Sequence, residues 1–120
     1  MPNRTSPRRI GRIVAILLCA VAVTSLGTLA GLAAASQYSV SQKGREFTPL
    51  DVKLKRGDSV LIVNDDADLQ HHAYIDSEKF TFDSGDQEPG SKTNVVFPVA
   101  GTFEVLCAIH PKMKLVVHVQ

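Results

Sequence analysis

Three side chains that bind metals lie within seven residues near the C-terminus, in the segment CAIHPKM. Cys107 contributes a thiol, His110 an imidazole and Met113 a thioether, with two residues between successive members. Thiolate and thioether are soft ligands, and with imidazole they suit copper, which can cycle between Cu(I) and Cu(II). A trigonal copper site with one thiolate needs two imidazoles, so the segment predicts a histidine ligand elsewhere in the chain.

The second imidazole must come from another histidine of the chain: His71, His72 or His118. On a strand, alternate side chains point to opposite faces, so His71 shares a face with Ala73 and Ile75, and His72 lies on the other. The first face is the more apolar. His118 lies on the last predicted strand next to the C-terminus, and we expect it to be solvated. The pattern therefore predicts His71 as the ligand and His72 as its outward neighbour.

The segment before CAIHPKM supports an inward-facing thiol. Phe103, Val105 and Cys107 alternate along one predicted strand, which places Cys107 on its apolar face. Taken singly, a buried cysteine is usually a small hydrophobic residue, a lone methionine usually fills a core, and surface histidines are common. Their joint occurrence at this spacing, with a His-His pair upstream, favours a metal site over these separate explanations.

The N-terminus has the pattern of an export signal. Four arginines precede an uncharged stretch, residues 13–35, that is rich in Leu, Ala and Val and ends in small residues. We expect residues 1–36 to be a signal peptide, cleaved near Ala35 or Ser36, and residues 37–120 to be the mature domain. An uncleaved membrane anchor is the alternative, because 23 apolar residues can span a hydrocarbon core of about 30 Å. Either case predicts a periplasmic or other extracytoplasmic domain.

Cysteine usage agrees with this export prediction. The chain has two cysteines, and Cys19 lies within the predicted signal segment. Its removal leaves Cys107 as the only thiol in a compartment where thiols normally pair. Met113 is likewise the only methionine after residue 36. An unpaired exported thiol is readily explained as a metal ligand.

Charge argues against one class of partner. All 12 acidic residues follow residue 36, whereas four of the 13 basic residues precede it. The predicted mature domain therefore has nine basic and 12 acidic residues, a net charge of −3. A small, mildly acidic domain of this kind is a poor candidate for binding nucleic acid.

Short apolar runs separated by turn residues predict an all-β domain. Alternation or β-branched enrichment marks about seven runs after residue 36: 52–54, 60–62, 74–75, 80–82, 95–97, 103–106 and 115–119. Arg56, Gly57 and Asp58 form a predicted turn between the first two runs. Residues 37–120 contain no convincing helical period. The pattern indicates one antiparallel sandwich or small barrel.

Three blocks resemble the blue-copper cupredoxins of the plastocyanin/amicyanin family, in the order expected there. They are FTPLDVKLKRGDSVLIVND, HHAYID and GTFEVLCAIHPKM, and the ligand loop is most like that of amicyanin. The resemblance implies a Greek-key β-sandwich of about 7–8 strands with one type 1 copper ion at one end. It also implies His71, Cys107 and His110 as trigonal ligands, with Met113 as a weak axial ligand. His72 departs from the family, which usually has an asparagine there, so a second-sphere role and a ligand role both stay open.

The function implied is that of a monomeric one-electron carrier rather than an enzyme. Family resemblance suggests transient redox partners, such as a dehydrogenase or a c-type cytochrome, and membrane contact only through an uncleaved N-terminal segment. We expect His110 to be the exposed edge of the site, with Lys112 and Lys114 flanking a salt-sensitive interface. Protonation of His110 in the reduced form is expected to make the redox reaction pH-dependent. The alternative is a copper-homeostasis protein that holds or delivers copper without redox cycling.

Overall fold

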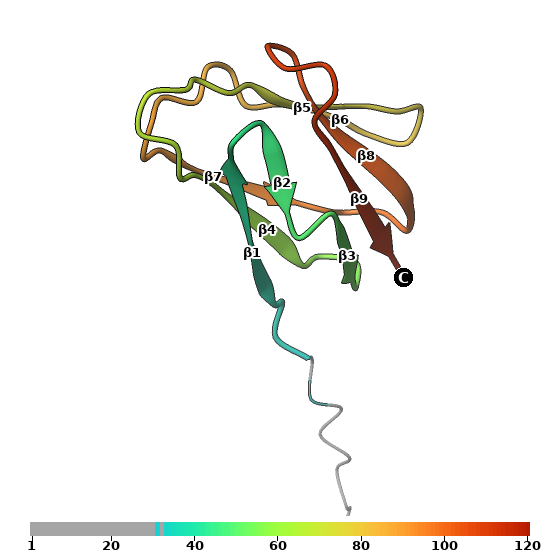
Figure 1. Cartoon of the computed structure of the whole chain (residues 1–120). Helices are drawn as coiled ribbons and strands as arrows, with labels where there is room; N and C mark the ends of the chain where they lie inside the picture. The colour runs from blue at the N-terminus through green and yellow to red at the C-terminus, as the bar shows by residue number, and fades with distance from the viewer. Residues whose placement is uncertain (1–30, 32) are drawn as a thin grey trace, which may run out of the picture. The chain divides into compact units, whose positions relative to one another are not determined.

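The computed structural model describes residue 31 and residues 33–120, which form nine strands in two sheets (Figure 1). The strands are β1 Gln37–Lys43, β2 Glu46–Thr48, β3 Asp51–Leu54, β4 Ser59–Asn64, β5 Ala73–Asp76, β6 Thr81–Asp83, β7 Lys92–Val96, β8 Gly101–Cys107 and β9 Lys114–Val119. The predicted signal segment lies almost entirely outside the described residues. Within residue 31 and residues 33–120, no helix has the length and apolar character needed to cross a membrane.

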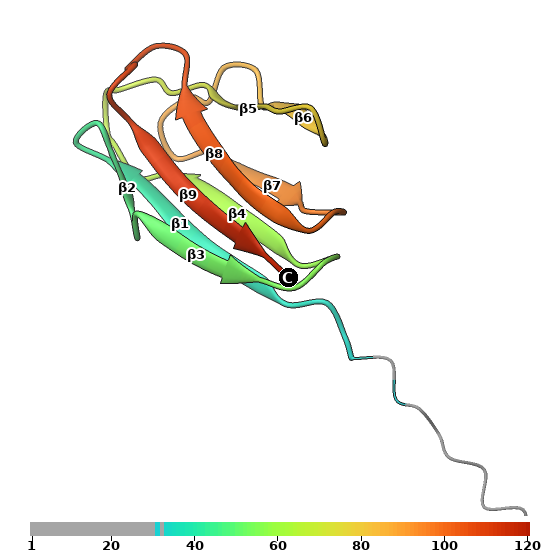
Figure 2. The same ribbon diagram turned by 90° about the vertical axis from the view of Figure 1, so that its right-hand side faces the viewer.

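The two sheets have the strand orders β2-β1-β4-β7 and β3-β9-β8-β5-β6, which confirms the predicted all-β sandwich (Figure 2). Most neighbouring strands pair in the predicted antiparallel sense, but β1 pairs with β4, and β3 with β9, in parallel. Both parallel pairs arise because β3 leaves the first sheet and joins the second. Neighbours in the sheets are therefore not always neighbours in sequence.

The sequence patterns missed β1 and β2. The segment QYSVSQK contains one aliphatic side chain, Val40, so it lacks the alternation that marks a strand. In the structure β1 nevertheless lies between β2 and β4, and both Val40 and Gln42 are fully buried. Backbone pairing with its parallel neighbour β4 therefore fixes the position of β1, which has no apolar pattern of its own.

Inward-facing side chains of both sheets form one core. Every second side chain of β3 and β4 points into the core. The buried ones include Val52 and Leu54 in β3, and Val60 and Ile62 in β4. Complete burial of an aliphatic or aromatic side chain contributes roughly 1.5–3 kcal/mol. Such a densely packed core gives the ends of its strands fixed positions.

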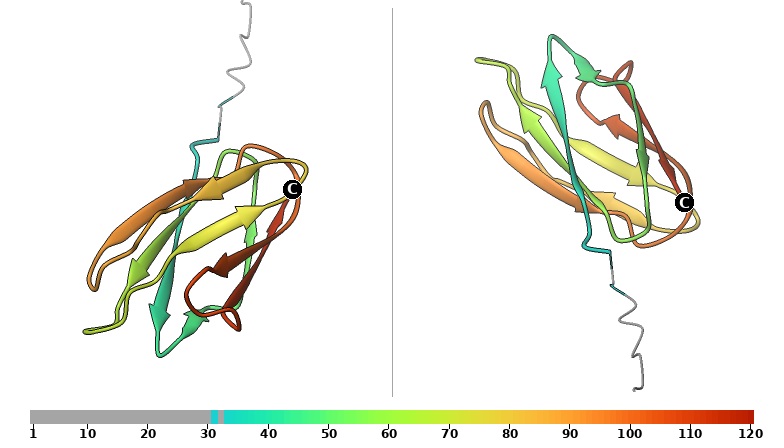
Figure 3. Two further views of the ribbon diagram at one scale, coloured as in Figure 1. Left: turned by 90° about the horizontal axis from the view of Figure 1, so that it is seen from above. Right: turned by 90° about the horizontal axis from the view of Figure 1, so that it is seen from below.

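The two ends of the sandwich differ in what they contain. At one end, the C-terminal Gln120 exchanges backbone hydrogen bonds with Leu54 and Arg56, and the Ser36 carbonyl accepts one from Ser59. At the other end lie the β1–β2 turn and the loop that joins β8 to β9 (Figures 2 and 3). The predicted metal-binding residues belong to this second end.

Candidate metal centre

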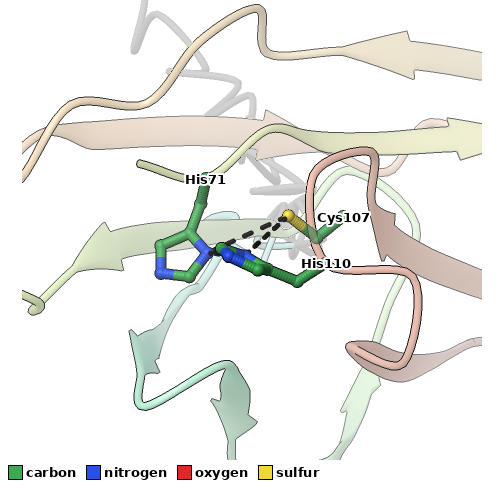
Figure 4. A group of neighbouring side chains, drawn as sticks. All are labelled: His71, Cys107 and His110. Atoms are coloured by element: carbon green, nitrogen blue, oxygen red, sulfur yellow. Dashed lines mark hydrogen bonds between the residues drawn. The ribbon is translucent and has the colours of Figure 1, made fainter. Parts of the chain in front are cut away.

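Two strands and one loop bring His71, Cys107 and His110 together (Figure 4). Cys107 is the last residue of β8 and pairs with Ala73, the first residue of β5. His71 lies two residues before Ala73, and its N–H and carbonyl bond to the carbonyl and N–H of Gln87 at 3.0 and 2.7 Å. His110 lies in the β8–β9 loop. His71 and Cys107 are buried, at 0% and 1% exposure, whereas His110 is half-buried.

The three donor atoms form a compact triangle with two nearly equal sides and one shorter side. Sγ of Cys107 lies 3.9 Å from Nδ1 of His71 and 3.8 Å from Nδ1 of His110, and the two nitrogens are 3.2 Å apart. The circle through the corners of such a triangle has a radius of about 2.1 Å, close to typical lengths of metal bonds to imidazole nitrogen and thiolate sulfur. A metal ion at its centre would contact all three atoms without any movement of the backbone.

Met113 closes the loop that contains His110. Its backbone N–H donates to the His110 carbonyl at 2.9 Å, and its side chain is 1% exposed. Met113 therefore adds a buried thioether to the loop that contains His110. The set of one free thiolate, two imidazoles and a thioether suits copper better than a hard metal ion.

Asp66 controls the orientation of His71, a contact that the sequence patterns did not reveal. Nε2 of His71 lies 2.7 Å from Oδ2 of Asp66, and an Nε2–H donated to this carboxylate directs Nδ1 toward Cys107. The second oxygen, Oδ1, accepts the backbone N–H of Gly44 at 3.0 Å. The Gly44 hydrogen bond, and then the contact with His71, hold the pKa of Asp66 below its usual range despite partial desolvation.

A buried amide network supports the backbone around His71. Asn64 Nδ2 donates to the carbonyls of Leu69 and Gln87 at 2.8 and 2.9 Å. Gln87 Oε1 accepts the side-chain amide of Gln42 at 2.8 Å and the N–H of Ala73 at 3.1 Å. Since Asn64, Gln42 and Gln87 are almost fully buried, these bonds are made in a low-dielectric interior and fix the path of the chain.

The environment of His110 disfavours protonation of its ring. Burial lowers the pKa of His110, and the nearby imidazole of His71 lowers it further. A neutral imidazole offers a ring nitrogen lone pair to a metal at neutral pH. The same side chain lies at the surface end of the group, so it is both a donor and the part of the site closest to solvent.

The other two histidines lie outside this group. As predicted, His72 points away from His71, and its ring contacts the carboxylates of Asp83 at 2.6 Å and Asp86 at 3.3 Å. Its backbone carbonyl accepts the N–H of Ala108 at 2.9 Å, so His72 does restrain the ligand loop, but through its backbone. His118 is partly exposed on β9, where its Nε2 contacts Asp51 at 2.7 Å.

Comparison with known proteins finds structural likeness only. No protein-family model and no curated protein matches the chain. Among solved structures, amicyanin from Paracoccus versutus matches with a TM-score of 0.64 and 21% identity over 70% of this chain and 81% of its own. A purple cupredoxin from Nitrosopumilus maritimus matches with a TM-score of 0.60 and 20% identity over 69% and 99%.

A copper-containing nitrite reductase from Thermus scotoductus SA-01 matches with a TM-score of 0.64 and 26% identity over 70% of this chain. The matched region is only 22% of the length of that reductase. All three structural neighbours share the β-sandwich described above. The fold is that of the cupredoxins, and the donor set of His71, Cys107, His110 and Met113 suits one copper ion.

Proposed function

We propose that this protein is a small exported type 1 copper protein that carries single electrons between redox partners. The observation that carries the proposal is the triangle of Cys107 Sγ and the two Nδ1 atoms, whose centre lies about 2.1 Å from each donor, a typical metal–ligand distance. In this proposal His71, Cys107 and His110, together with Met113, would hold the copper ion. The bound copper ion supplies a reversible one-electron couple between Cu(I) and Cu(II).

The protein contributes rigidity around this group. Cys107 and Ala73 face each other across paired strands, and Gln87 holds the backbone of His71 from the other side. Because the donors are already arranged around one point, oxidation and reduction need little movement of the chain. Such pre-arrangement favours fast electron exchange over chemistry on a bound substrate, and so supports a carrier rather than an enzyme.

His110 is the proposed route between the group and a partner. It is the half-buried member of an otherwise buried set, and exposed Ile109 and Pro111 flank it. Exposed apolar side chains beside the site support a transient complex with a redox protein, for example a dehydrogenase or a c-type cytochrome. The proposed state is a monomer in the periplasm or another extracytoplasmic compartment, where the free thiol of Cys107 is protected by burial.

A copper-homeostasis protein is the competing function, and the half-buried position of His110 is the observation that favours it. A carrier retains copper through many redox cycles, whereas a delivery protein releases it to an acceptor. Voltammetry of the copper-loaded full chain, run beside copper transfer to an excess of a Cu(I) chelator, separates the two. A reversible couple with slow transfer supports the carrier, and rapid transfer without a reversible couple contradicts it. His118→Ala, outside the group, is the matched control and should behave as the unmodified protein.

A further inference from the structure

A groove runs beside His110, between the β1–β2 turn and the β8–β9 loop. The turn contributes Arg45 and Glu46, and the loop contributes Ile109, Pro111 and Lys112. Figures 2 and 3 show these two segments side by side at the same end of the sandwich. The groove is therefore a surface feature that adjoins the exposed edge of the candidate metal centre.

Arg45 occupies a backbone conformation that disfavours it. Its φ is +63°, and that of Gly44 before it is +61°, so the two-residue turn has a positive φ at both positions. Glycine or asparagine normally fills such positions, because a Cβ atom there crowds the following carbonyl at a cost of roughly 1–2 kcal/mol. The turn thus contains a bulky cationic residue where a smaller one would be more stable, which points to a role for the side chain itself.

The turn is also fixed relative to the metal centre. Gly44 N–H donates to Oδ1 of Asp66, and Oδ2 of the same carboxylate accepts from His71. One side chain therefore connects the turn that presents Arg45 with a proposed copper ligand. A group bound by Arg45 would lie at a defined position beside His110.

The cations of the groove are available to an outside partner. Neither Arg45 nor Lys112 forms an ion pair within residues 33–120, whereas Lys114 is paired with Glu104 at 3.2 Å. Glu46 also lines the groove, which leaves the lining with a net charge of +1. The groove thus favours an anionic group, and a guanidinium can hold a carboxylate through two parallel hydrogen bonds.

We propose that this groove receives an acidic side chain of the protein that exchanges electrons through His110, with Arg45 as the anchoring residue and Lys112 as the second cation. The proposal rests on the proposed carrier function. It replaces the predicted pair of Lys112 and Lys114 with Lys112 and Arg45, because the charge of Lys114 is already compensated by Glu104.

The test is a titration of the full chain in its Cu(I) form with a hexaglutamate peptide, followed by backbone amide NMR. The expected result is saturable shifts at the amides of residues 44–46 and of Ile109, His110 and Lys112. Arg45→Glu should weaken peptide binding about tenfold, the change that corresponds to about 1.4 kcal/mol. Lys53→Glu makes the same change of net charge at an exposed position of β3, outside the groove, and should weaken binding less than twofold.

The parallel readout is the rate at which ferricyanide, an anionic reagent, oxidises the Cu(I) protein. Arg45→Glu should slow this rate several-fold more than Lys53→Glu does, with the visible spectrum unchanged. Equal effects of the two substitutions, or the absence of shifts at residues 44–46, would overturn the inference. If the groove inference fails but the redox couple is reversible, the carrier function still stands. An irreversible couple would contradict the carrier function, and the peptide titration would still show whether the groove binds acidic side chains.

Discussion

The carboxylate of Asp66 lies 2.7 Å from Nε2 of His71, on the side of the ring opposite the Cys107 sulfur. This contact fixes the tautomer and direction of a ring that is itself fully buried. It also places a negative charge next to a proposed ligand, and that charge stabilises Cu(II) more than Cu(I).

Asp66→Asn should therefore raise the reduction potential. Loss of the charge removes about 1–2 kcal/mol of preferential Cu(II) stabilisation, which corresponds to about 40–90 mV for a one-electron couple. Copper affinity should fall about 10–100-fold, as is usual when a group that orients a ligand is lost. Voltammetry and competition with a chelator measure both quantities. Asp68→Asn, at an exposed nearby position, is the control, and equal potentials of the two variants would contradict the role of Asp66.

Gln87→Ala should lower the free energy of unfolding by about 2–3 kcal/mol. The substitution removes the partner of the buried Gln42 amide and one acceptor of the Ala73 N–H, and each lost buried partner costs about 1–3 kcal/mol. Denaturant unfolding followed by fluorescence or circular dichroism gives the change. Gln70→Ala removes a solvent-exposed hydrogen bond to Glu88 and should cost less than about 0.5 kcal/mol. A similar loss of unfolding free energy in both variants would show that the buried network stabilises the fold no more than an exposed hydrogen bond does.

Arg45→Gly should stabilise the protein by about 0.5–1 kcal/mol. Glycine relieves the positive φ, and the gain is partly offset by the greater freedom of glycine in the unfolded chain. Lys43→Gly, on β1 only two residues earlier, lacks this relief and should destabilise by about 0.5–1 kcal/mol. The urea concentrations at the unfolding midpoints of the two variants measure these changes. A loss of stability in Arg45→Gly would show that the positive φ of Arg45 does not strain the fold.

Asp58 should make stability depend on pH in the acid range. Its carboxylate accepts the backbone N–H groups of Ser36 at 2.7 Å and Lys55 at 2.8 Å, and these bonds lower the pKa of Asp58. Because the folded pKa lies below the unfolded value of about 3.9, the stabilisation is present above about pH 4 and disappears as the pH falls through the folded pKa.

Asp58→Asn should therefore be less stable than the unmodified protein at pH 7, and the difference should shrink as the pH falls below about 4. Thermal unfolding at several pH values measures this convergence. A difference that stays constant over the whole acid range would show that the carboxylate charge is not its cause.

The reduction potential should rise as the pH falls, because protonation of His110 stabilises the reduced form by competing with Cu(I) for the ring. Because a proton must compete with Cu(I) for the ring, the rise should begin below the ordinary histidine value of about 6.5. Voltammetry between about pH 4 and pH 8 tests the effect. A potential that is flat over this range would exclude protonation of His110.

Period-two alternation predicted the parts of the structure that are local in sequence. It placed Cys107 inward at the end of β8 and distinguished buried His71 from outward His72, and both placements depend only on neighbouring residues. The polar strand β1 could not be found in this way, because its burial comes from pairing with β4. The contacts of His71 with Asp66 and Gln87 depend on loop paths and on a bridge across 16 residues, for which the sequence has no local pattern.

The visible absorption spectrum of the copper(II)-loaded protein tests the central claim most directly. If Cys107, His71 and His110 hold the ion, the spectrum contains an intense thiolate-to-copper band. The band should be lost in Cys107→Ser and kept in His72→Ala and His118→Ala. A weak spectrum like that of ordinary cupric sites, or an intense band that survives Cys107→Ser, would contradict the account.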